Sequence, residues 1–179
     1  MSLAQFRHGY IANSVLNALA KASLAGTRLR IEVSEAVLLA QSDAINEQLH
    51  RLKSRGAKIV LDDFGVDNSR LRLLSRSALD AVKLDRTLVE RVGEEPEVAA
   101  LVRSLIGTAQ SFDLDILAEG IERAEQAHFL MSNDIQKVQG FLFGRPTRKR
   151  DLGAIIAKDL RNTMEGEPKA APRPTTVAA

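Results

Sequence analysis

The chain has 179 residues, 45% hydrophobic and 27% charged, which is the size and composition of one globular domain with a sizeable core. Its 25 basic and 23 acidic residues nearly balance and only 4% of residues are aromatic, so we expect neither a DNA nor an RNA partner. The absence of cysteine excludes disulfides, Cys-zinc sites and thiol catalysis, and no apolar run or signal pattern predicts a membrane partner, so a cytoplasmic location is expected.

Two helices and two strands are predicted in the first third of the chain. Apolar residues at helical spacing mark a first helix that Gly26 is placed to end, and a strand follows at about 28–33. A second apolar stripe predicts a helix that closes near Arg55 and Gly56, before a buried strand at 57–61. The two stripes are Ile11, Val15, Leu19 and Ala22, and then Leu38, Ile45, Leu49 and Leu52.

The alternation of strands and helices continues to about residue 164. The expected strands are 78–84, 114–118 and 135–141, and the expected helices are 69–75, 122–131 and about 149–164. Pro96 is suited to be the first residue of a further helix, which has the clearest apolar stripe in the chain. From Glu165 on no apolar period remains, so we expect a domain of residues 1–164 and a disordered tail at 165–179.

The order of elements is one helix followed by five strand–helix units. Strands that alternate with helices favour a parallel sheet with right-handed crossovers. A closed eight-stranded barrel usually needs about 200 residues or more, whereas about five strands are recognisable here. The expected fold is therefore α/β, a partial TIM-like (β/α) barrel whose early strands are missing.

Charged or amide side chains follow the apolar runs of all five expected strands. Their spacing is close to the length of one strand, one helix and two loops. Because the carboxyl ends of parallel strands meet at one edge of a sheet or barrel, we expect these side chains to share one site. The residues are Glu32, Asp62, Asp63, Lys83, Asp85, Glu119, Glu122 and Gln139.

Carboxylates gathered at a barrel mouth repel one another unless a cation holds them, and oxygen ligands favour Mg²⁺, Mn²⁺ or Ca²⁺. The adjacent Asp62 and Asp63 can reach two metal ions, an arrangement that suits phosphodiester hydrolysis. Lys83 would add a fixed positive charge beside the charge that develops in the reaction. Glu119 or Glu122 could act as the general base.

Each of these groups also has an interpretation without function. The segment 62–65 could be a strand-to-turn junction with a capping Asp, and Glu32 and Glu35 could be solvated. The segment 83–85 could hold a surface ion pair of little energetic value, and 119–122 could simply begin a helix. The combination is more specific than any one part, because five strands in series end in a polar group.

Five segments resemble the EAL domain family, bacterial signalling phosphodiesterases that hydrolyse cyclic di-GMP to pGpG. They are Arg-Ile-Glu-Val-Ser-Glu at 30–35, Leu-Asp-Asp-Phe-Gly at 61–65, Val-Lys-Leu-Asp at 82–85, Leu-Ala-Glu-Gly-Ile-Glu at 117–122 and Val-Gln-Gly-Phe-Leu-Phe-Gly-Arg-Pro at 138–146. Their order and spacing match over about residues 2–160. The resemblance implies a modified TIM barrel, Mg²⁺ or Mn²⁺ as cofactor in a two-metal site, and cyclic di-GMP as ligand.

The resemblance also implies roles for single residues. Glu32 and Asp62 are similar to metal ligands of the family, and Asp63 is similar to a ligand of the second metal. Lys83 is similar to the lysine that helps to orient the nucleophilic water, and Glu119 to the general base or a second-metal ligand. The residues with supporting roles are Glu35, which is similar to the glutamate that anchors the loop after Asp62 and Asp63, together with Asp85, Glu122 and Gln139.

The sequence departs from the family pattern in two places. The Glu-Ala-Leu strand and the next strand, which ends in an Asn ligand, have no counterpart in these residues. The loop 66–70 differs from the usual Thr-Gly-Tyr-Ser-Ser, which couples metal binding to dimerisation in the family. We therefore expect an incomplete metal site, weak or absent activity, and homodimerisation or other association through open sheet edges.

Two alternatives remain open from the sequence. The chain could be a non-catalytic module that binds cyclic di-GMP or another protein. It could also come from an incomplete gene model, whose upstream part restores the missing motif.

Overall fold

The computed structural model describes residues 1–7, 9–40, 42–66, 71–75 and 78–164, and the expected tail at 165–179 lies outside them. Five strands form one parallel sheet in the order β1-β2-β3-β4-β5, which confirms the predicted α/β sheet. The strands are β1 Arg30–Val33, β2 Lys58–Phe64, β3 Ala81–Leu84, β4 Asp115–Ala118 and β5 Lys137–Val138. The helices are α1 Leu3–Arg7, α2 Ile11–Lys21, α3 Glu35–Leu39, α4 Asp43–Ser54, α5 Leu71–Leu74, α6 Arg86–Arg91, α7 Pro96–Ser111, α8 Ala124–Ser132 and α9 Lys149–Met164.

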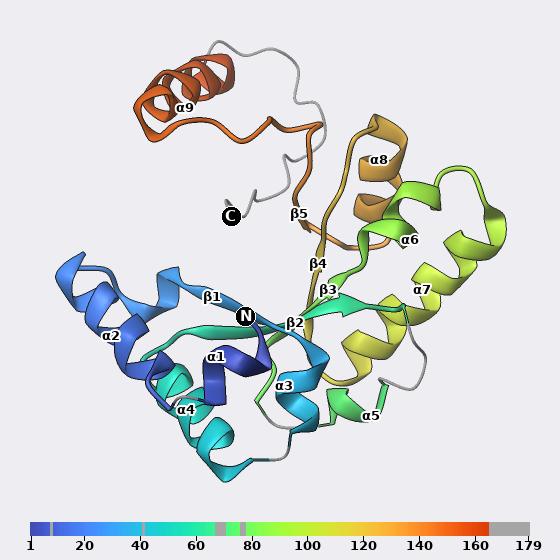
Figure 1. Cartoon of the computed structure of the whole chain (residues 1–179). Coiled ribbons are helices and arrows are strands. Elements are labelled where there is room, and N and C mark those ends of the chain that lie inside the picture. The colour runs from blue at the N-terminus through green and yellow to red at the C-terminus, as the bar shows by residue number, and fades with distance from the viewer. Residues whose placement is uncertain (8, 41, 67–70, 76–77, 165–179) are drawn as a thin grey trace.

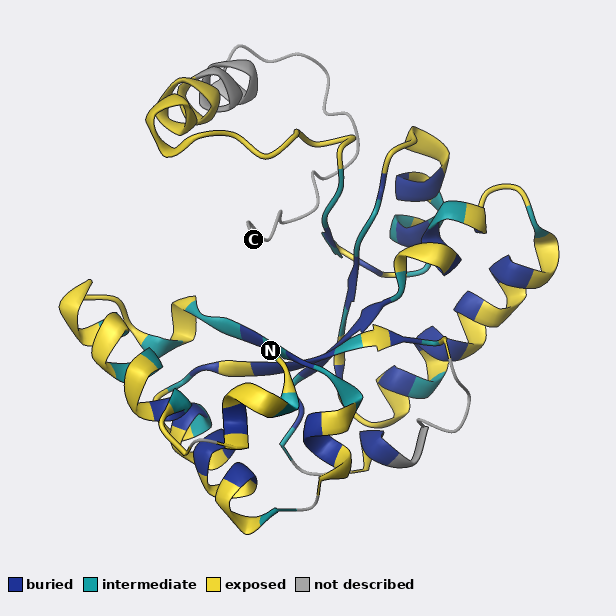
Figure 2. Ribbon diagram, in the orientation of Figure 1, coloured by how far each residue is buried: buried dark blue, intermediate teal, exposed yellow. Residues whose placement is uncertain are grey.

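The helices are distributed unevenly around the curved sheet. Helices α1 to α8 lie around the lower and right-hand side of the sheet, and α9 lies apart at the upper left (Figure 1). Buried residues concentrate in the strands and on the sides of the helices that face them, whereas the part of α9 whose burial is described is exposed (Figure 2). No described helix is long and apolar enough to cross a membrane.

The two faces of the sheet carry different residues. One face packs against the helices and belongs to the main core, with Ile59 and Val82 fully buried. The other face holds a small separate cluster, which consists of Val60, Ala81 and Leu117. In the parallel register Glu32 pairs with Val60, and Lys83 pairs with Leu117. Since paired residues project to the same side of a sheet, these charged side chains share the face of the small cluster.

Several predicted element boundaries are confirmed, and others are wrong. Helix α7 begins at Pro96 and α9 covers 149–164, as expected. Helix α4 closes at Arg55, before Gly56 with its φ of +88°. The second predicted helix is two helices, α3 and α4, because the backbone at Ser42 is extended with φ −88° and ψ 125°. The sequence patterns missed the short helices α1 and α6.

The strand predicted at 135–141 is only two residues long. After β5 the chain approaches the loop behind β4: Ile121 N donates to Gln139 O (3.1 Å), and Leu142 N donates to Ile121 O (3.0 Å). A Cβ at Gly140 would lie 2.0 Å from Ile121 O, so only glycine permits this approach. The residues after Gly140 therefore form a turn instead of a strand.

Gly26 does not end the first helix, contrary to the sequence prediction. Helix α2 ends at Lys21, and Ser23 adopts the left-handed conformation (φ 52°) that closes it. Gly26 instead begins a 3₁₀ turn, Gly26–Arg28, at which two backbone segments meet. A Cβ at Gly26 would lie 1.9 Å from the carbonyl oxygen of Arg55.

The substitution Gly26→Ala is expected to destabilise the fold by at least about 1–3 kcal/mol, because the backbone of Arg55 must move to admit the methyl group. Chemical denaturation measures this change in the free energy of unfolding. Gly107→Ala is the matched control, since Gly107 is exposed in α7 and has no atom within 4 Å of the added Cβ. The control is expected to gain about 0.5–1 kcal/mol from helix propensity. Equal effects of the two substitutions would contradict the close approach at Gly26.

Candidate functional site

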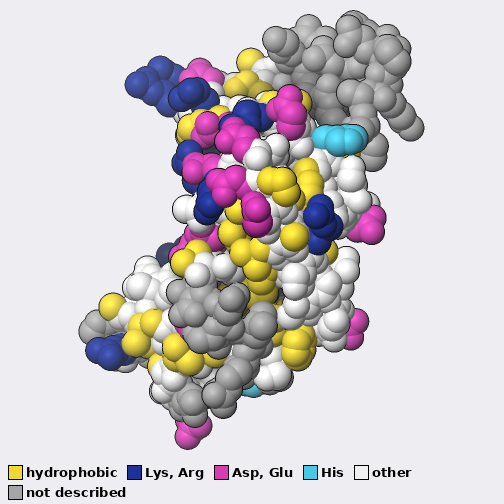
Figure 3. Space-filling view, turned by 90° about the vertical axis from the view of Figure 1, so that its right-hand side faces the viewer, with side chains coloured by type: hydrophobic (Ala, Val, Ile, Leu, Met, Phe, Trp, Pro, Cys, Tyr) yellow, Lys and Arg dark blue, Asp and Glu magenta, His cyan; other side chains and the backbone are white. Residues whose placement is uncertain are grey.

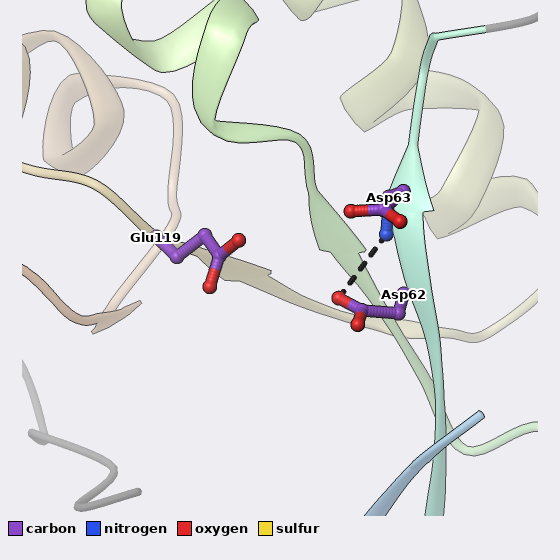
Figure 4. A group of neighbouring side chains, drawn as sticks. All are labelled: Asp62, Asp63 and Glu119. Carbon is purple, nitrogen blue, oxygen red and sulfur yellow. Dashed lines mark hydrogen bonds between the residues drawn. The ribbon is translucent and has the colours of Figure 1, made fainter. Parts of the chain in front are cut away.

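Two adjacent carboxylates stand at the end of β2. Side chains of consecutive strand residues normally point to opposite faces. Here the register between β2 and β3 shifts between Leu61 and Phe64, and Asp63 has a positive φ of 55°. The Asp63 backbone N–H donates to Asp62 Oδ1 at 3.2 Å. This irregularity brings both carboxylates to the same side of the sheet, toward Glu119 (Figure 4).

Glu119 follows the last residue of β4 and completes an acidic trio. One ligand oxygen from each of Asp62, Asp63 and Glu119 lies within 4.8 Å of the others. Asp62 and Glu119 are half-buried, and Asp63 is exposed. The arrangement brings together carboxylates that lie more than fifty positions apart in the sequence, as the shared edge of a parallel sheet predicted.

The Lys83 ammonium lies in the middle of this site. Its side chain, on β3, is only 9% exposed. Its Nζ lies 2.7 Å from Glu119 Oε2 and 2.9 Å from Glu32 Oε2. Its distance to Asp62 Oδ1 is 3.5 Å. Lys83 therefore joins carboxylates from β1, from β2 and from the end of β4.

The environment of Lys83 keeps it charged. Burial disfavours the ammonium and by itself lowers the pKa of this lysine. Hydrogen bonds to Glu119 and Glu32, together with the charge of Asp62, outweigh burial, so that the pKa of the lysine is raised above its ordinary value. The group is a permanent cation at neutral pH and cannot serve there as a proton acceptor.

The carboxylates that contact Lys83 outnumber its single charge. Those of Glu32, Asp62 and Glu119 lie within 3.5 Å of the one ammonium, so negative charge is in excess among these four groups. All the donor atoms are carboxylate oxygens, which are the ligands that Mg²⁺, Mn²⁺ and Ca²⁺ prefer. The chemistry of this donor set fits a hard divalent cation.

Glu32 takes a different position from the acidic trio. Its predicted role as a metal ligand would place it with Asp62. In the structure its Oε2 binds Lys83, and it is not one of the three residues whose ligand oxygens converge within 4.8 Å.

The structure places the other predicted site residues around this centre. Asp85 caps α6, since its Oδ1 accepts from the Thr87 backbone N–H at 2.8 Å. Glu122 Oε1 pairs with Arg86 Nη2 at 2.9 Å. Gln139 N donates to Ala118 O at 2.8 Å, which ties β5 to the end of β4. Glu35 is the first residue of α3, and most of the loop it was expected to anchor, 67–70, lies outside the described residues.

Sequence reasoning missed two residues near this site. Arg86 pairs with Glu122, and Gln126 is a buried polar residue, 1% exposed. The Gln126 side chain accepts from the backbone N–H groups of Glu122 and Arg123, each at 2.9 Å. A Gln three residues after a helix N-cap is a recognisable capping signal, but Arg123 is an unusual cap and hides the pattern.

Comparison with known proteins identifies a protein family and several relatives that this chain resembles. Residues 1–146 match the model of the EAL domain. The bifunctional diguanylate cyclase/cyclic di-GMP phosphodiesterase MucR of Pseudomonas aeruginosa is 34% identical over 157 residues, which are 88% of this chain and 23% of MucR. The chain spans less than a quarter of the length of the first curated relatives that it matches.

Solved structures show the same architecture. The EAL domain of DcpA from Mycobacterium smegmatis has a TM-score of 0.80 and 28% identity, and the match covers 88% of this chain and 71% of that domain. BlrP1 from Klebsiella pneumoniae, in a complex with manganese and cyclic di-GMP, has a TM-score of 0.67 and 33% identity, with 75% and 34% covered. The five-stranded sheet is thus part of a TIM-like barrel, which confirms the predicted fold class.

Proposed function

This chain belongs to the EAL domain family, and from that premise we propose that its acidic site is part of a metal-dependent phosphodiesterase centre for cyclic di-GMP. The observation that carries the proposal is the convergence of Asp62, Asp63 and Glu119 beside the buried Lys83. Two relatives support the ligand and the cation: MucR is a cyclic di-GMP phosphodiesterase, and BlrP1 forms a complex with manganese and cyclic di-GMP.

In this proposal Asp62 and Asp63 hold the metal ions, Mg²⁺ or Mn²⁺, with Glu32 as a further ligand. The ions would activate water and stabilise the charge of the phosphodiester in the transition state. The adjacent positions of Asp62 and Asp63 suit two metal ions, because each carboxylate can bind a different ion. Gln139, Glu35 and Asp85 fix the strand ends and helix starts around them.

Glu119 and Lys83 carry the remaining chemistry of the proposal. Glu119 is half-buried beside Asp62 and Asp63, where its carboxylate can accept a proton from an attacking water. Lys83 remains protonated, so it orients that water and stabilises negative charge without exchanging a proton. Glu122 is held by Arg86 and supports the loop that carries Glu119.

We further propose that these 179 residues, taken alone, hydrolyse cyclic di-GMP weakly or not at all. Among the described residues no strand pairs with the outer edge of β1 or of β5, so the site lies on an open sheet. Such unpaired edges favour association, and a homodimer in the cytoplasm is the state we propose. A module that binds cyclic di-GMP or a protein without catalysis is the alternative, favoured by the same open sheet.

Metal binding tests the candidate ligands directly. Titration of the purified chain with Mn²⁺ by calorimetry is expected to show binding. Asp62→Asn should weaken this binding by at least about tenfold, because it removes a charged oxygen ligand, and Glu119→Gln should weaken it similarly, because it removes one negative charge from the acidic trio. Glu97→Gln, at the exposed first turn of α7, removes an equal charge from a residue outside the trio and should leave the affinity unchanged. Equal losses in all three variants would show a nonspecific charge effect and contradict the site.

A further inference from the structure

Arg86, the first residue of α6, lies against the loop that carries Glu119. Gly120 has a φ of +77°, which favours glycine. A Cβ built on Gly120 would lie 2.5 Å from Arg86 Cγ and 3.1 Å from its Cδ. The aliphatic part of the arginine thus covers the residue that directly follows Glu119, and a larger residue at position 120 would have to displace it.

The guanidinium of Arg86 joins the same loop to its own helix. Its Nη2 lies 2.9 Å from Glu122 Oε1, and its Nε donates to Glu90 Oε1 at 2.5 Å. Glu90 is the largest cause that raises the pKa of Arg86, and the charges of Glu122 and Glu119 contribute as well. Arg86 therefore interacts electrostatically with Glu119, the candidate base, and it also contacts Gly120 and Glu122.

A second set of contacts fastens the far end of the loop. The buried Gln126 accepts from Glu122 N and Arg123 N, and its Nε2 donates to Glu90 O at 3.3 Å. Arg123 Nη2 also donates to Glu90 O, at 2.9 Å. Acidic and basic side chains lie intermixed on the upper half of this side of the molecule (Figure 3). Residues 119–123 are thus held to α6 at both ends.

An exposed ion pair alone would be worth little. Two facts separate Arg86 from such a pair. Its carbon stem contacts Gly120 directly. Its helix, α6, begins two residues after β3, the strand that carries Lys83, ends at Leu84. Arg86 therefore links the segment after β3, the strand of Lys83, to the loop of Glu119. The Lys83 ammonium and the Glu119 carboxylate lie 2.7 Å apart.

We infer that Arg86 is a positioning residue of the site. It holds the loop 119–122 so that the Glu119 carboxylate stays beside Lys83 and the two aspartates, and it keeps the Glu122 carboxylate turned to α6. The inference rests on the proposed function in so far as the acidic trio binds a divalent cation. It concerns a residue that touches neither the ion nor the substrate.

The test compares Arg86→Ala, Arg86→Lys and Arg91→Ala in the full chain. Arg91 is the matched control, because it lies on the same helix and pairs with Glu95, four residues further along the chain. Calorimetry measures the affinity for Mn²⁺, and hydrogen exchange measures protection of the Ile121 and Glu122 amides, which donate to Gln139 O and Gln126 Oε1. Arg86→Ala is expected to weaken Mn²⁺ binding about tenfold and to speed exchange at these amides. Arg86→Lys keeps the stem and charge and should recover most of both, while Arg91→Ala changes neither.

The outcomes separate the two levels of the proposal. If the unsubstituted chain binds no Mn²⁺, the proposed metal site is wrong. Amide exchange alone then tests whether Arg86 fixes the loop 119–122. If Mn²⁺ binds and Arg86→Ala changes exchange but not affinity, Arg86 is only structural and the inference is overturned. Unchanged exchange and affinity in Arg86→Ala overturn it as well. Circular dichroism of each variant confirms that the comparison is between folded chains.

Discussion

Lys83→Met is expected to lower the free energy of unfolding by about 1–3 kcal/mol. The substitution keeps an unbranched side chain in the buried position but removes the ammonium. The carboxylates of Glu32, Asp62 and Glu119 would then face one another without the cation that now lies within 3.5 Å of each. These carboxylates are only half-buried, so water screens part of their repulsion, but losing the cation that they share should cost more than losing an exposed ion pair.

The matched control for this experiment is Lys137→Met. Lys137 shares the sheet face of Lys83 and pairs with Asp115, but that carboxylate is 59% exposed. Its loss should cost less than about 1 kcal/mol. Added Mn²⁺ should raise the melting temperature of the Lys83 variant more than that of the unsubstituted chain, because the ion replaces the lost positive charge. Equal stability of the two lysine variants would show that Lys83 does not neutralise the site.

The pH dependence of this difference follows from the pKa of Lys83. Folding raises the pKa of Lys83, so its contribution is complete below the unfolded value near 10.5 and is lost as the pH rises through the higher folded value. The gap in stability between the unsubstituted chain and Lys83→Met should therefore stay constant from neutral pH to about pH 10 and shrink above it. Denaturation midpoints across this range measure the gap.

The sequence predicted the meeting of distant carboxylates because strand polarity constrains it. In a parallel sheet every strand ends at the same edge, so apolar runs followed by charged residues locate a site without any contact information. A different kind of signal located the start of α7 at Pro96 and the end of α4 near Gly56. These signals are local, since a proline or a left-handed glycine restricts its own backbone.

The details that shape the site are not local. The register shift in β2 and the positive φ of Asp63 depend on how β3 pairs with β2, and aspartate carries no clear signal for either. Lys83 and Asp85 suggested a neighbouring ion pair, but Lys83 bonds to Glu32 and Glu119, whereas Asp85 lies beyond the end of β3 and caps α6. The role of Gly26 was predicted wrongly for the same reason, because its constraint comes from Arg55, which follows β1, α3 and α4 in the chain.

Hydrolysis of cyclic di-GMP distinguishes the proposed states of this chain. With saturating Mn²⁺, the 179-residue protein is expected to form pGpG at roughly one hundredth or less of the rate of the MucR EAL domain. The reason is geometric: the candidate ligands come from β1, β2 and the end of β4, and the described sheet is open beyond β1 and β5. A substrate laid on this surface would be enclosed on one side only, so water and the phosphodiester would be poorly fixed.

Glu119→Gln and cyclic di-GMP calorimetry complete this experiment. A rate equal to that of MucR, abolished in Glu119→Gln, would show that these residues form a working centre and that the expected weakness is wrong. Measurable cyclic di-GMP binding without pGpG would favour the non-catalytic module. Binding of Mn²⁺ that is weakened in Glu119→Gln, together with the slow hydrolysis predicted above, is the outcome we expect, because Asp62, Asp63 and Glu119 already converge while the sheet that holds them remains open. Failure to bind either Mn²⁺ or cyclic di-GMP would contradict the assignment of a phosphodiesterase site to this part of the fold.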